Sequence, residues 1–157
     1  MSKQRKRQSA NHAVSPGSAA TQAAQLNQTV AHFSTIIDTF ARHGSINLLD
    51  NQRRQHMFAA YVFGMLLAYG KREGLPPPTV LGAMNMLLVT KFGYGMQSAD
   101  HLTHELLNAT QPEYDTLQHT VIYRGIAGFG GWTTQGHEVA VNDFLACVAT
   151  VETVRTL

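Results

Sequence analysis

The chain has 157 residues, of which 44% are hydrophobic and only 14% are charged, and its formal net charge is +2. This length suits one domain with a sizeable core, and the sparse charge favours a surface that a partner protein or a second copy partly covers. The longest apolar run, residues 57–69, is too short to cross a bilayer, so no membrane partner is expected.

Basic residues are concentrated at the start of the chain. Four of the twelve Lys and Arg residues lie within residues 1–7, and the other eight are outnumbered by ten Asp and Glu residues. A slightly acidic remainder does not favour nucleic acid as a partner of the folded part. The basic start continues into polar residues, unlike the apolar segment of a signal peptide, and Cys147 is the single cysteine. A reducing cytoplasm is therefore the expected location.

Residues 1–20 lack apolar periodicity, and we predict a disordered basic tail there, followed by an all-α domain over residues 21–157. The first helix is predicted over residues 21–43, with Gly44 as its C-cap. Its apolar residues recur at spacings of three and four: Leu26, Val30, Phe33, Ile37 and Phe40.

The second helix is predicted over residues 50–72, with Asp50 as its N-cap. It is apolar on nearly every side, which is typical of a central helix. Gly70, Gly74 and the prolines at 76–78 end it, because proline removes a backbone donor and disfavours helical geometry in the residue before it.

The remaining sequence predicts four more helices with short connections. The third helix is expected from residue 78 or 79 to residue 91, and the fourth from a cap at Ser98 to Asn108. The fifth is expected from Pro112 to the pair Gly130–Gly131, and the sixth over residues 139–154. No stretch alternates apolar and polar residues as a half-buried strand would. We therefore predict a single compact all-α domain of about six helices, with bundle-like or orthogonal packing.

The segment 121–132 combines four glycines with an apolar helical pattern. Glycine in a helix interior costs roughly 1 kcal/mol relative to alanine, so a compensating interaction is expected. Gly125 and Gly128 lie one turn apart, and they predict a flat strip on which a neighbouring helix packs closely.

Arg124 lies within the same apolar helix, where a guanidinium must be paired, stacked or turned to solvent. Two interpretations stay open: display to a partner, or an ion pair within the fold with Asp115, Asp143 or Glu138. Trp132 belongs to a residue type that is enriched in binding hot spots.

Candidate chemical sites are weak. His101 and His104 lie three residues apart beside Asp100 and Glu105, a spacing that can place two imidazoles on one face of a helix. The HExxH order is absent and no cysteine adds a ligand, so neither a metal nor another cofactor is expected. Cys147 lies among small apolar residues, where a thiol is usually inert. No serine-nucleophile or phosphate-binding motif occurs, so we do not expect an enzyme.

Several blocks together resemble a known family. They are the Gly-Tyr turn at 92–96, a short histidine-bearing helix, the Pro-Glu-Tyr start at 112–114, and the block Ile122 to Phe129 followed by Trp132. This order is similar to small all-α immunity proteins of bacterial polymorphic-toxin systems. The likeness covers roughly residues 45–135, and Ala127 departs from the polar residue expected there.

The resemblance implies a protein that binds and neutralises a cognate toxin made by the same cell, by occluding its active site or its docking surface. It implies no catalysis. The partner-binding residues that we predict on this basis are Tyr94, His101, Tyr123, Arg124, Phe129 and Trp132.

Two other classes stay open at this point. One is a self-associating adaptor or regulatory module, which would use the Gly125 and Gly128 strip, and a homodimer would be its simplest form. The other is a helical DNA-binding protein that uses the basic tail, which is less favoured because the rest of the chain is slightly acidic.

Overall fold

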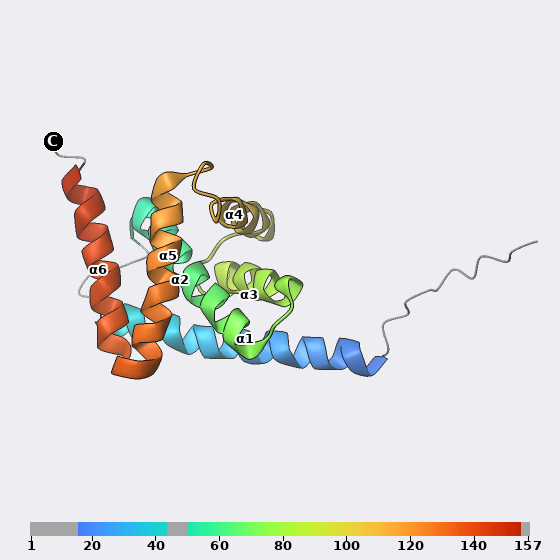
Figure 1. Ribbon diagram of the computed structural model, residues 1–157. Coiled ribbons are helices and arrows are strands. Elements are labelled where there is room, and N and C mark those ends of the chain that lie inside the picture. Colours follow the sequence, from blue (N-terminus) through green and yellow to red (C-terminus); the bar gives the residue numbers. More distant parts are fainter. Residues whose placement is uncertain (1–15, 44–49, 155–157) are drawn as a thin grey trace, which may run out of the picture.

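The computed structural model describes residues 16–43 and 50–154. These residues form six helices and no strand, which confirms the predicted all-α class (Figure 1). The helices are α1 (Pro16–His43), α2 (Gln52–Glu73), α3 (Pro77–Thr90), α4 (Met96–Asn108), α5 (Thr116–Gln135) and α6 (His137–Val154). None of the described helices has the length and apolar character that crossing a membrane requires.

The helices pack around α2. Figure 1 shows α5 and α6 as an antiparallel pair, with α2 against α5 and with α1 crossing one end of the pair. α3 lies between α1 and α4, and contacts both. The first turns of α1 extend past the rest of the molecule and are exposed.

The core is built on the apolar run of the second helix, as predicted. Every residue of α2 from Met57 to Leu66 is buried. Phe58 and Tyr61 pack against Phe144 of α6 at ring-centroid distances of 5.2 and 5.3 Å, and Phe40 of α1 closes the cluster 5.3 Å from Phe58. Burying each of these rings contributes roughly 2–3 kcal/mol, so they join α1, α2 and α6 into one unit.

Glycines allow α2 and α5 to approach backbone to backbone. A methyl group on Gly125 would overlap the Tyr61 carbonyl oxygen, and one on Gly64 would overlap the Ile122 carbonyl oxygen. Gly128 faces the Tyr61 hydroxyl in the same way. The predicted strip is confirmed, with Gly64 as a partner that the sequence analysis did not identify. Because α2 covers it, the strip is not a surface for a second copy.

The ends of α2 show why the predicted N-cap was wrong. Asn51, not Asp50, is the N-cap, and its Oδ1 accepts hydrogen bonds from the backbone N of Arg53 and Arg54 at 2.9 and 3.3 Å. Both residue types cap helices well, and the register of the first turn decides between neighbours. Gly74 ends the helix in the left-handed conformation at φ 65°.

Several other predicted bounds differ. α1 begins at Pro16, α3 at Pro77 and α4 at Met96, whose N-cap is Gly95 and not Ser98. The predicted tail up to residue 15 and the predicted cap Gly44 lie outside the described residues.

The largest difference is in α5. Asp115 caps this helix by accepting a hydrogen bond from Gln118 N at 2.9 Å, so Pro112 precedes the helix and does not begin it. The helix continues through Gly130 and Gly131, where a break was predicted. It ends at Gly136, whose φ of 97° is unfavourable for residues with a side chain.

Candidate functional site

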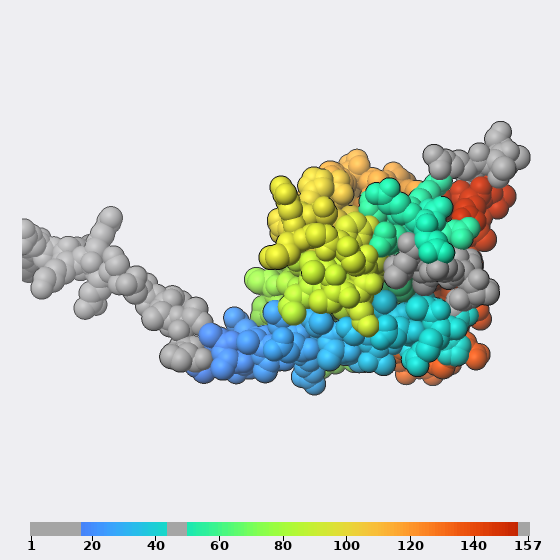
Figure 2. All heavy atoms as spheres, turned by 180° about the vertical axis from the view of Figure 1, so that it is seen from behind, coloured from blue at the N-terminus to red at the C-terminus, as the bar shows by residue number. Residues whose placement is uncertain are grey.

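A groove of about 810 Å³ lies where the start of α2 faces α4, and we call it the α2–α4 groove. Figure 2 shows α4, in yellow, on the molecular surface near the start of α2, in teal. Gln52 and His56 of α2 line the groove together with Tyr94, which precedes α4. The α4 residues that complete it are Gln97, Ser98, Asp100, His101, Leu102, His104 and Glu105.

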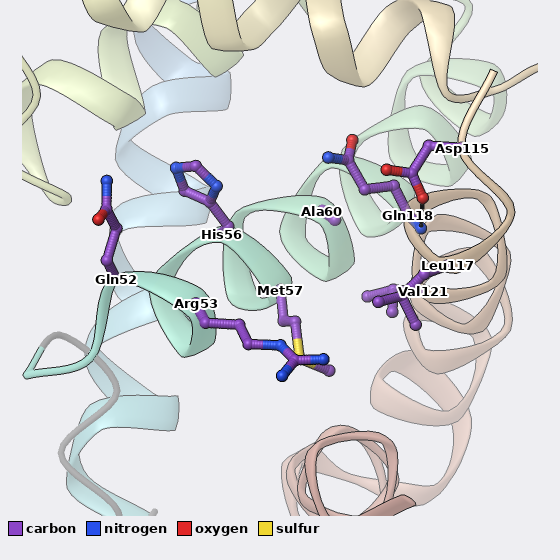
Figure 3. A pocket seen from close by; sticks show the side chains of 9 residues that line it. All are labelled: Gln52, Arg53, His56, Met57, Ala60, Asp115, Leu117, Gln118 and Val121. Atoms are coloured by element: carbon purple, nitrogen blue, oxygen red, sulfur yellow. Dashed lines mark hydrogen bonds between the residues drawn. The ribbon is translucent and has the colours of Figure 1, made fainter. Parts of the chain in front are cut away.

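A second hollow, of about 320 Å³, lies between the start of α2 and the start of α5, and we call it the α2–α5 pocket (Figure 3). It shares Gln52 and His56 with the α2–α4 groove, so the two hollows adjoin. Its other lining residues are Arg53, Met57, Ala60, Asp115, Leu117, Gln118 and Val121.

Backbone contacts hold Tyr94 in place at the groove. The Tyr94 N–H donates to the Leu88 carbonyl at 3.0 Å, and the Gln55 side-chain amide donates to the Phe92 carbonyl at 2.7 Å. The first bond ties the connection between α3 and α4 to α3, and the second ties it to α2. The Tyr94 ring stacks against His56 at a centroid distance of 6.1 Å, and burial raises the pKa of the Tyr94 hydroxyl.

Two buried polar atoms of these hollows have no hydrogen-bond partner within the described part of the chain. They are Tyr94 Oη, which belongs to a residue that lines the α2–α4 groove, and Gln118 Oε1, which belongs to a residue that lines the α2–α5 pocket. No other buried side-chain N or O atom of the described residues is unpaired. An unpaired buried polar atom costs about 1–3 kcal/mol. A bound group that supplies the missing partners would recover this cost.

The charge on the α4 side of the groove is unbalanced. Residues 92–123 contain four carboxylates and no Lys or Arg. Glu105 Oε1 lies 3.4 Å from His101 Nε2, and Asp100 Oδ1 lies 3.7 Å from His104 Nε2, along one side of α4. These contacts are ion pairs only while the histidines are protonated. The α4 side of the groove is therefore acidic whenever they are neutral.

The six predicted contact residues fall into three places. Tyr94 and His101 line the α2–α4 groove. Tyr123 and Arg124 lie on the outer face of α5, where Tyr123 is 54% exposed and its ring lies tilted against His119, with the ring centroids 4.4 Å apart. The structure does not bring these two pairs into one hollow.

Arg124 forms an ion pair with Asp143 of α6, one of the three partners considered above. This hydrogen-bonded contact raises the pKa of Arg124. The Tyr61 hydroxyl lies 2.9 Å from Asp143 Oδ2 and 3.2 Å from the Ala140 carbonyl oxygen, either of which accepts its single hydrogen. Burial, and then the Asp143 charge, raise the pKa of Tyr61. The network joins α2, α5 and α6 while leaving part of Arg124 exposed.

Phe129 and Trp132, the other two predicted contact residues, make ring contacts within the fold. Phe129 is 4% exposed and lies under the Arg72 guanidinium, 4.9 Å from ring centroid to Cζ. Trp132 is half-buried and stacks on Phe40 of α1 at 5.9 Å with nearly parallel rings. Both rings join α5 to neighbouring helices, so truncating either would remove packing before it removed a partner contact.

Comparison with known proteins decides the family. The family model described as immunity protein 48 matches residues 26–152, which span most of the described fold and both hollows. The chain belongs to the immunity protein 48 family. No match was found among curated proteins or among solved structures.

The residues that build the hollows in this immunity protein 48 family member were only partly predictable. Tyr94 and His101 were predicted as contacts, whereas Gln52, His56 and Gln118 were not. These three carry no motif, because they meet only when α2 lies beside α4 and α5. Two polar residues at the start of an apolar helix, Gln52 and His56, were the one signal available.

The single cysteine lines neither hollow. Cys147 is buried, and burial raises the pKa of its thiol, which keeps it protonated and unreactive at neutral pH. Among the described residues, no three His, Cys, Asp or Glu side chains are arranged to hold a metal ion. What the groove presents to a partner is hydrogen-bonding groups, negative charge and an aromatic ring.

Proposed function

We propose that this chain neutralises its toxin by binding it directly in a one-to-one complex, with the α2–α4 groove and the α2–α5 pocket at the centre of the contact surface. Membership of the immunity protein 48 family assigns the chain a toxin-neutralising immunity function. The complex, its stoichiometry and the contact surface are the parts that we add.

One observation carries the choice of surface. Tyr94 and Gln118, the two described residues that carry an unpaired buried polar atom, both line these adjoining hollows. The two oxygen atoms are covered in the free protein, so a partner must shift these side chains to reach them. It then supplies hydrogen bonds that the free protein lacks, and this favours the bound state. His101 lies on the rim of the same groove and is a further contact in this proposal.

The outer face of α5 is the alternative contact surface. It presents Tyr123 and the exposed part of Arg124, two residue types that are common in binding hot spots. Neither Tyr123 nor Arg124 lines the α2–α4 groove or the α2–α5 pocket, which is why we place this face second. The self-associating alternative loses its specific support, because α2 occupies the Gly125 and Gly128 strip.

The proposal requires no turnover by the chain, and it places the chain in the cytoplasm, where it meets the toxin before export. A binding inhibitor blocks at most one toxin molecule per chain, whereas an enzyme that modifies the toxin inactivates many. The two mechanisms therefore differ in the amount of protein needed.

We predict a linear titration. When the purified chain is added to a fixed concentration of the toxin encoded beside its gene, toxin activity should fall in proportion and reach its minimum at one molar equivalent. Light scattering should show one complex whose mass is the sum of one copy of each protein. Complete inactivation by a few hundredths of an equivalent would contradict the binding mechanism.

A further inference from the structure

We infer that the α2–α4 groove receives a basic surface of the toxin, with a lysine or arginine side chain seated between α4 and Tyr94. This inference rests on the proposed function and names the chemistry of the partner at that same site. Three features of the described residues support it.

The first feature is the charge that stays unbalanced around α4. Asp100 and Glu105 line the groove, and their only ion-pair contacts within the described chain are with histidines of the same helix. The Lys and Arg side chains that form ion pairs do so elsewhere: Arg54 with Glu152, Arg72 with Glu73, Lys91 with Asp38, and Arg124 with Asp143. A basic partner would supply the missing cation, and complementary charge accelerates association.

The second feature is the groove wall at Tyr94. Its hydroxyl oxygen is buried and unpaired, and its ring lies beside His56. An ammonium or guanidinium group donates hydrogen bonds to a hydroxyl oxygen and is attracted to the face of an aromatic ring. A neutral or anionic side chain of the partner would interact favourably with fewer of the groove's groups, which are the Tyr94 hydroxyl, the Tyr94 ring and the carboxylates of α4.

The third feature is the exposed apolar surface along the same part of the chain. Met96, which directly precedes the groove residue Gln97, is 79% exposed, and Leu117, which lines the adjoining α2–α5 pocket, is 41% exposed. Lysine and arginine bury their aliphatic stems on apolar surface while their charged ends reach an acceptor. A mixed acidic and apolar surface therefore fits a basic protein surface better than it fits nucleic acid or an anionic membrane.

The test uses charge reversal with a matched control. Asp100→Lys combined with Glu105→Lys reverses the charge of these two groove residues. Asp100→Asn combined with Glu105→Gln neutralises that charge without adding bulk. Glu138→Lys, an exposed position at the start of α6, makes the same type of change away from α4. All variants and the wild type are measured against the toxin encoded beside the gene, by stopped-flow association and by calorimetry.

The expected result is a fall of about 10–100-fold in the association rate constant for the reversed pair, a smaller fall for the neutral pair, and less than a twofold change for Glu138→Lys. Wild-type affinity should also fall as NaCl rises from 50 to 500 mM. Circular dichroism should be unchanged in every variant.

If the reversed pair bound the toxin as fast as the wild type does, and salt did not change the wild-type affinity, the inference would be overturned and the proposed function would stand. If the wild-type chain formed no complex with the toxin, both the inference and the proposed function would be wrong. Equal losses for the reversed pair and for Glu138→Lys would show a general effect of net charge, and would also overturn the inference.

Discussion

Gly125→Ala is expected to lower the free energy of unfolding by about 3 kcal/mol, or roughly 10 °C in the thermal midpoint. The added methyl group would overlap the Tyr61 backbone carbonyl, which cannot move without shifting α2. Gly64→Ala meets the Ile122 carbonyl from the opposite side and should cost a similar amount. Urea unfolding followed by circular dichroism at 222 nm measures both.

Gly130→Ala is the matched control in the same helix. Gly130 is exposed, and a methyl group there would meet no atom within 4 Å. Alanine should therefore stabilise the protein by about 0.5–1 kcal/mol through its higher helix propensity. If Gly125→Ala unfolded at the same urea concentration as Gly130→Ala, the close packing of α2 on α5 would be wrong.

Ser98→Trp is expected to weaken toxin binding by at least about 100-fold and to abolish protection of cells that express the toxin. Ser98 is exposed and lines the α2–α4 groove, so an indole there would fill the space that a partner side chain needs. The side chain points away from the core, and the unfolding midpoint should stay within a few degrees of the wild type. Calorimetry with the purified toxin measures the affinity.

Two further tryptophan variants locate the contact surface. Ala149→Trp, exposed on α6, should bind as the wild type does. Ala127→Trp lies on the outer face of α5 beside Tyr123 and Arg124, and tests the alternative surface. Loss of binding in Ala127→Trp with normal binding in Ser98→Trp would move the contact surface from the groove to α5.

The sequence predicted those parts of the fold that depend on local pattern. Apolar spacing located six helices, and the apolar run at 57–69 marked the central one. The helix ends were less predictable, because several residues in a row were able to cap or break a helix. Asp50 and Asn51 are both good caps, and the structure uses Asn51. The pair Gly130–Gly131 was the predicted end of α5, yet the helix continues to Gly136, which the sequence analysis did not identify.

The candidate site was less predictable because it depends on contacts between distant segments. The glycines of α5 indicated close packing without indicating that the partner would be Gly64. Phe129 and Trp132 are residue types that are common in binding surfaces. Only the structure shows that Phe129 packs under Arg72 and that Trp132 stacks on Phe40. The α2–α4 groove forms only because α2 and α4 lie on either side of it, and no local sequence pattern indicates this placement.

Hydrogen exchange of the chain with and without its toxin tests the central claim most directly, because it reports both the complex and the surface that the complex covers. The account predicts slower exchange on binding in residues 52–56 and 94–105, which line the α2–α4 groove, and unchanged exchange in residues 146–153 of α6. A complex that protects α6 or the outer face of α5, and leaves residues 94–105 unchanged, would contradict it.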